Sequence, residues 1–146
     1  MSVTFLVPWA LFVALMAVAG LHASWARGGV WPAQNADQLA DWVVGEAFRV
    51  GMPPAKAIWL VVAALVFAAC DGLALAIHFS DPLEKLVVWA GAGLCGVFGL
   101  RGIAGYTPFW RAAHPGVSFT WMDKRFYSPF CVLIAEGFFT LVSDRL

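Results

Sequence analysis

Four long apolar stretches alternate with short polar segments along the chain. The apolar stretches run from Thr4 to about Trp25, from Lys56 to Phe79, from about Leu83 to Ile103 and from Ser128 to Val142. A helix that crosses a bilayer needs about 20 predominantly apolar residues, with a range of roughly 17–25. The pattern therefore predicts an all-α protein, a bundle of four membrane-spanning helices. The fourth span is short, with Pro129 in its first turn, where a missing N–H is tolerated.

The polar segment between the first two stretches has helical features of its own. Asn35 followed by Gln38 resembles a capping box, and Gly51 with Pro53 and Pro54 is a stop signal. Between them, one helix face would hold Ala36, Leu39, Ala40, Val43, Ala47 and Val50, and the other Asp37, Gln38, Asp41 and Arg49. This predicts a short amphipathic helix. It either lies in the membrane interface or caps the bundle without contacting lipid, and both interpretations stay open.

The third stretch is rich in glycine. It follows a Ser80-Asp81-Pro82 turn, which predicts that the second and third helices form an antiparallel hairpin. Its glycines match G-x-G-x-x-G, but that motif indicates dinucleotide binding only between a strand and a helix. Inside an apolar span, small residues instead let helices approach closely. We therefore expect the third helix to be the centre of the bundle, with its glycines at 91, 93, 96, 99, 102 and 105.

Composition strengthens the membrane interpretation. Of 146 residues, 62% are hydrophobic and 12% charged, and the mean hydropathy is +0.79. Soluble domains carry about 25% charged residues. We therefore expect one integral membrane domain over residues 1–146. The nine basic and nine acidic residues argue against nucleic acid as a partner.

No metal site, disulfide framework or cofactor is expected, because the three cysteines lack ligand spacing. The first basic residue is Arg27, so we expect an uncleaved N-terminal span rather than a signal peptide.

Basic residues are concentrated on one side of the predicted spans. The first and third connections hold Arg27, Arg49, Lys56, Arg101, Arg111, Lys124 and Arg125, whereas the opposite side holds Lys85 and Arg145. Short loops rich in Lys and Arg stay in the cytoplasm. Both termini are therefore predicted to lie on the non-cytoplasmic side.

Three ionisable residues are predicted to converge near the cytoplasmic side. His22 ends the first span, Arg101 ends the third, and Glu136 lies about 10 Å into the fourth. An ionised side chain at this depth needs a partner. One interpretation is an Arg101–Glu136 pair that fixes helix packing. The other is a polar pocket open to the cytoplasm, lined also by Trp25 and Tyr127, with His22 as its titratable group.

Asp71 and His78 form a second set, lying deeper or toward the outer face. Asp71 is expected to be neutral, hydrogen-bonded through His78, or part of a proton path. His22 and His78 lie toward opposite faces, so they cannot bind one haem iron.

Two segments carry a resemblance to a known family. HASWARGGVWP (22–32) and RFYSPFC (125–131) resemble a bacterial family of small four-helix membrane proteins known only as a domain of unknown function. The resemblance implies four helices and a bacterial membrane but no activity. Gly28, Gly29 and Pro32 are expected to form a sharp structural turn. We expect this turn to face Tyr127 and to close the mouth of the Glu136 pocket.

Three functions follow as hypotheses. The first is a binding or accessory protein of the bacterial cytoplasmic membrane, with a polar pocket that faces the cytoplasm. The second is a small proton-coupled transporter that uses Glu136 or Asp71. The third, an enzyme for a lipid-soluble substrate, lacks a visible nucleophile and base. The expected partners are the lipid bilayer and a homo-oligomer or a larger membrane complex.

Overall fold

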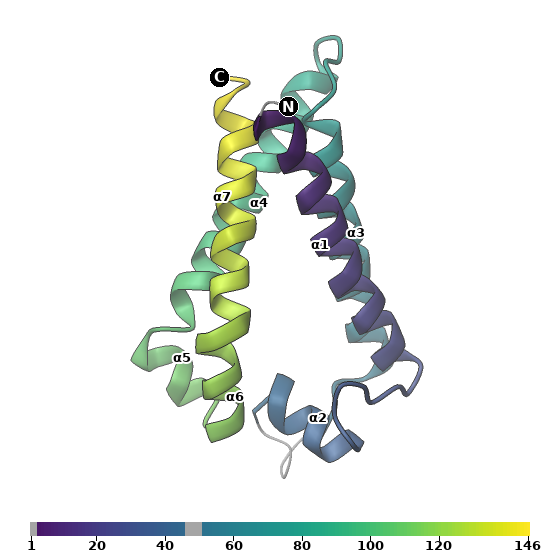
Figure 1. The fold of residues 1–146 in the computed structure, drawn as a ribbon, viewed down its shortest axis with the longest axis vertical. Coiled ribbons are helices and arrows are strands. Elements are labelled where there is room, and N and C mark those ends of the chain that lie inside the picture. Colours follow the sequence, from purple (N-terminus) through teal and green to yellow (C-terminus); the bar gives the residue numbers. More distant parts are fainter. Residues whose placement is uncertain (1–2, 46–50) are drawn as a thin grey trace.

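The computed structural model describes residues 3–45 and 51–146, which form a helical bundle (Figure 1). Its helices are α1 (Val3–Ala26), α2 (Ala36–Val43), α3 (Ala55–Ala74), α4 (Leu83–Ala104), α5 (Pro108–Ala113), α6 (Val117–Met122), the π-helical turn η1 (Asp123–Tyr127) and α7 (Ser128–Ser143). Four helical segments are long and apolar enough to cross a membrane. They are α1, α3, α4 and the continuous stretch Val117–Ser143. The predicted all-α architecture with four spans is confirmed.

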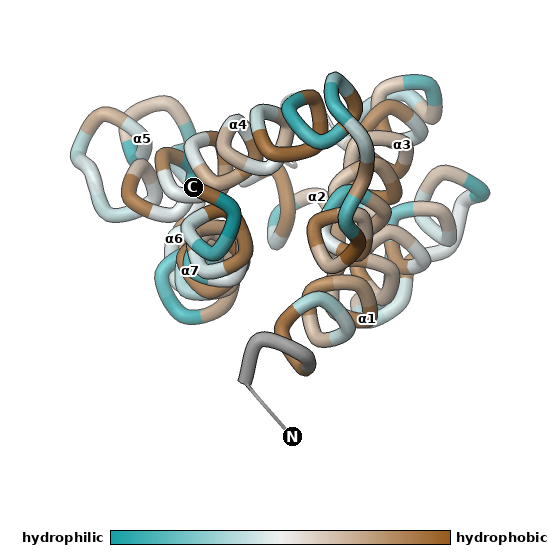
Figure 2. The backbone as a smooth tube through the Cα atoms, turned by 90° about the horizontal axis from the view of Figure 1, so that it is seen from above, coloured by the Kyte–Doolittle hydropathy of each residue, from teal (hydrophilic) through white to brown (hydrophobic). Residues whose placement is uncertain are grey.

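The four long helices form two pairs. α1 packs along α3, and α4 packs along α7. The pairs meet at the end that holds the start of α1 and the end of α7, and they diverge toward the other end (Figures 1 and 2). We call these the narrow end and the wide end. The wide end holds α2, α5 and α6.

The predicted hairpin of the second and third spans needs correction. α3 ends at Ala74 rather than Phe79, and residues 75–82 form a longer connection than the expected three-residue turn. The main neighbour of α4 is α7, not α3. α3 and α4 approach closely near Gly91, where an added Cβ would lie 2.7 Å from Leu75 Cδ1.

The core lies where the two pairs meet. Leu11 of α1 is buried against α7, and a Cβ added at Gly137 would lie 2.8 Å from its Cδ2. Phe138 is fully buried and stacks on Phe98 of α4, with 6.3 Å between ring centroids. Because lipid tails are as apolar as these side chains, close packing rather than removal from water holds the helices together.

The prediction that the third span is the centre of the bundle is wrong. Only 11% of the residues in the most apolar part of α4 are buried, against 22% for α1 and 33% for each of the other two spans. Its glycines mostly recur every three residues, whereas the helix turns every 3.6, so they spread around the axis. A Cβ at Gly93 or Gly96 would meet open space, while Gly91, Gly102 and Gly105 are closely packed.

The fourth span begins at Val117 rather than at Ser128, so Pro129 lies inside a continuous helix. A proline within a helix lacks one N–H and clashes with the carbonyl four residues earlier. Here the preceding turn is widened to a π-turn, in which the N–H of Ser128 donates to Asp123 O, five residues back. The widened turn accommodates the proline ring, so the helix passes through it.

The predicted amphipathic helix is α2, and Asn35 is its cap as expected. Asn35 Oδ1 accepts from the N–H of Gln38 at 2.9 Å. Leu39 and Ala40 are buried, and α2 packs against α6. These contacts favour a helix that caps the wide end of the bundle. The predicted face positions Ala47, Arg49 and Val50 lie outside the described residues.

Candidate functional site

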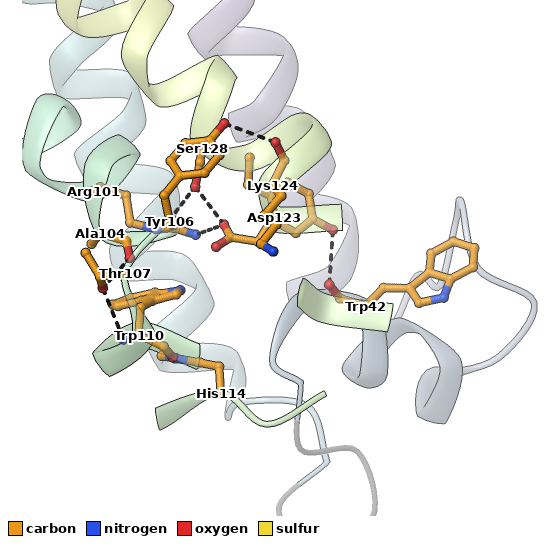
Figure 3. A network of polar contacts seen from close by, with 11 residues as sticks. Trp42, Arg101, Ala104, Tyr106, Thr107, Trp110, His114, Asp123, Lys124 and Ser128 are labelled. Atoms are coloured by element: carbon orange, nitrogen blue, oxygen red, sulfur yellow. Dashed lines mark hydrogen bonds and ion pairs between the residues drawn. The ribbon is translucent and has the colours of Figure 1, made fainter. Parts of the chain in front are cut away.

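An ion pair joins the end of α4 to the π-turn at the wide end. Arg101 Nη2 donates to Asp123 Oδ1 at 2.6 Å, and the Asp123 side chain is almost completely buried. Ser128, also fully buried, donates from Oγ to the same carboxylate oxygen at 3.3 Å. Its Oγ accepts from Arg101 Nη1 at 3.4 Å. Figure 3 shows the three side chains pointing toward one another. We call them the Arg101–Asp123–Ser128 triad.

The triad fits closely around a glycine. A Cβ added at Gly105 would clash with Ser128 Oγ and lie 2.5 Å from Asp123 Oδ2. Asp123 Oδ2 is buried and has no hydrogen-bond partner among the described residues. One carboxylate oxygen therefore accepts two hydrogen bonds, while the other lies against the backbone of the α4–α5 connection.

A stack of aromatic rings continues from the triad along α5 and α6. The Arg101 guanidinium lies over the Trp110 ring, 4.6 Å from its centroid. His114 lies between Trp110 and Phe119, with centroid distances of 4.2 and 5.1 Å. A guanidinium over an indole face is stabilised by the ring quadrupole. The Arg101 guanidinium thus contacts the Asp123 carboxylate on one side and the Trp110 ring on another. These two contacts hold the wide end together.

Tyr127 links this cluster to the other helix pair. Its hydroxyl donates to Trp42 O at the end of α2, at 3.2 Å. The expected contact of Tyr127 with the Gly28–Pro32 turn stays a prediction, and the hydrogen bond that its hydroxyl makes among the described residues is this one to α2. The two segments that carry the family resemblance therefore lie at the same end of the bundle, with α2 beside α6 there.

Glu136 is not part of the cluster, and the expected pair with Arg101 is not formed. Ala135, the next residue back, faces Gly99 of α4, and the neighbouring Glu136 side chain is exposed on the outer surface. There it lines a groove of about 250 Å³ between α4 and α7, together with Cys95, Gly99, Ile103, Val132, Ala135 and Phe139. The sequence predicts how far Glu136 lies from the end of its helix, but not the direction of its side chain. That side chain points away from the side that holds Arg101.

His22 and Trp25 lie on the other helix pair. The His22 ring packs against Trp25 with 4.7 Å between centroids, and its Nδ1 lies 2.9 Å from Val18 O. The Trp25 indole N–H donates to Trp31 O at 2.8 Å, which folds the segment after α1 back onto the helix. The expected convergence of His22 with Arg101 and Glu136 is therefore not found.

The Gly28-Gly29 turn has the expected tight geometry. Gly28 has φ +90°, a value that L side chains rarely adopt. The N–H of Gly28 donates to Trp25 O at 3.0 Å and that of Gly29 to Ser24 O at 2.9 Å. These two bonds form a Schellman motif, which satisfies carbonyls that a helix end leaves free. The segment is a well-formed helix terminus.

The expected hydrogen bond between Asp71 and His78 is not formed. Asp71 is buried in α3, and its Oδ2 has no partner among the described residues. His78 is exposed and lies 2.7 Å from Arg145 Nη1, which also donates to Glu84 Oε1 at 2.7 Å. Arg145 further donates to the backbone carbonyl of Leu75. These contacts form a clasp at the narrow end, joining the chain after α7 to the α3–α4 connection.

Sequence reasoning missed Asp123 and Ser128. Asp123 falls in the connection between the third and fourth predicted spans, beside Lys124 and Arg125, where no buried residue is expected. The sequence does contain one indication, the spacing of Asp123 and Tyr127. These residues are four apart, so a helix that extends through Pro129 toward the N-terminus brings them onto one face. Chemically, the triad is a cross-link between elements. Among the described residues, no group of three or more His, Cys, Asp or Glu side chains is placed to hold a metal ion.

The architecture and this arrangement define a multi-pass membrane protein whose wide end is closed by buried polar and aromatic contacts. The family model described as "Protein of unknown function (DUF3995)" matches residues 15–138, and the chain belongs to that family. The match covers the triad, Glu136 and the Gly28-Gly29 turn. Neither a curated protein nor a solved structure matches the chain.

Proposed function

We propose that this protein has an accessory role in the membrane, acting by association within the bilayer through the outer face of α4 and α7. The observation that carries the proposal is the exposed side chain of Glu136. It shares a groove with Cys95 and Gly99, in the second half of α4, and makes no side-chain hydrogen bond or ion pair with another described residue. Placing a carboxylate at such a depth costs about 2.5–3.5 kcal/mol on insertion scales. A partner surface that forms hydrogen bonds with the carboxyl group offsets this cost.

The chain itself has no cation to offer Glu136 among the described residues at this depth. Arg101 lies at the end of α4 and is held by Asp123. A second copy of the chain is the occupant we propose for the groove. Two copies inserted in the same orientation and related by a two-fold axis along the membrane normal bring equal depths together. Glu136 then meets the partner's Glu136, and the two carboxyl groups can share a proton.

Co-capture of two differently tagged copies tests this association. Membranes are extracted with a polymer that retains native lipid, and one tag is captured while the other is detected. We expect co-capture of wild type, loss in Glu136→Leu, and retention in Glu136→Gln, whose amide still forms hydrogen bonds. Leu133→Ala alters the same face without removing the polar group and serves as the control. Co-capture of Glu136→Leu at the wild-type level would overturn the proposal, as would a wild-type complex that contains only one copy.

The location belongs to the same proposal. The wide end holds Arg27, Lys56, Arg101, Arg111, Lys124 and Arg125, and the narrow end holds Lys85 and Arg145. Following the positive-inside rule, we place the wide end in the cytoplasm and the protein in the bacterial cytoplasmic membrane. The family resemblance in the sequence supports the bacterial assignment.

Proton-coupled transport is a second candidate, favoured by Asp71. This carboxyl group is buried between α3 and α4, and its Oδ2 would lie 3.2 Å from a Cβ at Gly91. Buried, unpaired acids in membrane helices are typical of proton paths. In proteoliposomes that contain a pH-sensitive dye, wild type should conduct protons under an applied potential and Asp71→Asn should not. Asp81→Asn, at an exposed position, is the control. Absence of flux in wild type would eliminate this candidate.

A further inference from the structure

A second groove lies at the wide end of the bundle. It lies where the His114–Gly116 connection meets α6, has a volume of about 390 Å³, and is lined by Pro115, Gly116, Val117, Thr120, Trp121 and Lys124. It is separate from the Arg101–Asp123–Ser128 triad, which faces α4. It is also at the opposite end of the α4–α7 pair from the clasp of Arg145.

The depth of the groove corresponds to the headgroup layer. Lys124 O accepts from the Tyr106 hydroxyl at 3.1 Å, which places Lys124 just beyond the end of α4 at Ala104. Thr120 and Val117 lie about 6 and 10 Å farther along the helix axis. The 27-residue stretch Val117–Ser143 is about 40 Å long, which matches a bilayer including its headgroups.

The surface around the groove is apolar and aromatic. Val117, which lines the groove, is 89% exposed. Trp121 and Phe126, also exposed, pack edge to face with 5.7 Å between ring centroids. Exposed aromatic side chains at a helix end are typical of the membrane–water interface. The groove therefore borders lipid headgroups rather than bulk water.

The charge near the groove is positive and available. In the part of the chain that the structure describes, neither Lys124 nor the adjacent Arg125 takes part in an ion pair. At the narrow end, by contrast, Lys85 is paired with Asp81 at 3.2 Å and Arg145 with Glu84. Asp123, the nearest acidic residue in sequence, is buried and turned toward Arg101. Among the described residues, the ammonium group of Lys124 therefore has no carboxylate partner and can bind an anion.

We propose that this groove binds the headgroup of an anionic phospholipid. The Lys124 ammonium contacts the phosphate, and the Thr120 hydroxyl donates a hydrogen bond to it. The Trp121 ring borders the glycerol region, from which the acyl chains run into the bilayer. Basic pockets beside membrane helices on the cytoplasmic side are suited to anionic headgroups.

Native mass spectrometry of lipid adducts tests the proposal. The purified protein is mixed in detergent with equal amounts of phosphatidylglycerol and phosphatidylcholine of matched acyl chains. Wild type should retain phosphatidylglycerol in preference. Lys124→Gln should reduce that preference about fivefold, the loss expected for one basic residue near an anionic lipid. Lys124→Arg should keep it.

Two control variants make the test specific to the groove. Arg125→Gln removes an adjacent charge that does not line the groove, and Lys85→Gln removes a paired charge at the narrow end. Both should retain the preference better than Lys124→Gln. An equal loss in Arg125→Gln would indicate diffuse attraction and overturn the proposal. So would equal retention of the two lipids by wild type, or displacement of phosphatidylglycerol by inorganic phosphate, which would assign the site to the free anion.

Discussion

Arg101 and Asp123 lie 22 residues apart, yet their side chains meet at 2.6 Å and join α4 to the π-turn of the last span. Removing one member leaves the other charge buried without its partner, which costs about 3–5 kcal/mol in typical proteins. We therefore expect Arg101→Leu and Asp123→Leu each to lower the stability of the protein in detergent strongly. The double variant should lose less than the sum of the two. Thermal unfolding of the three variants gives the comparison, and additive losses would show that the side chains act independently.

Gly105 should tolerate no side chain. A Cβ there would clash with Ser128 Oγ, so Gly105→Ala should cost about 1–3 kcal/mol through overpacking. Gly96→Ala is the matched control, because Gly96 lies in α4, the helix that Gly105 caps, and faces open space. The control should be neutral or slightly stabilising, since alanine favours a helix over glycine. Equal unfolding temperatures for the two variants would contradict the close packing around the triad.

Gly28 should be sensitive for a different reason. Its φ of +90° costs an L residue about 1–2 kcal/mol, although an added Cβ would meet no neighbour. Gly28→Ala should therefore be destabilising, whereas Gly20→Ala, inside α1 with open space around it, should not. Unfolding curves in one detergent distinguish the two. A Gly28→Ala variant as stable as wild type would show that the Schellman turn is dispensable.

Accessibility labelling should place residues 80 and 143 on the same side of the membrane. In a variant with all three cysteines replaced, we expect Ser80→Cys and Ser143→Cys to react with an impermeant maleimide from outside the cytoplasmic membrane. Ala112→Cys, at the wide end, should react only after lysis. The reverse pattern would invert the proposed orientation. Opposite results for residues 80 and 143 would contradict the four-span architecture itself.

The four spans could be predicted because lipid leaves the backbone few alternatives to a helix. The prediction for the first span, Thr4 to about Trp25, compares with Val3–Ala26 in the structure, and the third span agrees equally well. Hydropathy fails where polar residues are buried. Asp123, Lys124 and Arg125 are consistent with a loop, but Asp123 is neutralised by Arg101 and the helix continues through it.

The partner of Arg101 could not be deduced from depth alone. Counting residues predicts how far a side chain lies along a helix, but the direction in which it points depends on every turn being regular. Glu136 is at a plausible depth yet faces outward, while Asp123 faces Arg101 from beyond an irregular turn. The pairing of the helices could not be predicted either, because α4 packs mainly against α7 and less against α3, its neighbour in sequence.

The π-turn at Asp123–Tyr127 also affects how related chains should be aligned. It holds about one residue more than an α-helical turn of the same rise. A relative that lacks one residue between Met122 and Pro129 would keep a continuous helix, but everything before the gap would rotate by about 100°. Its counterpart of Asp123 would then turn away from α4, and the acid that reaches Arg101 would have to come from a neighbouring position. Deletions at this point should therefore occur together with a shifted acidic residue.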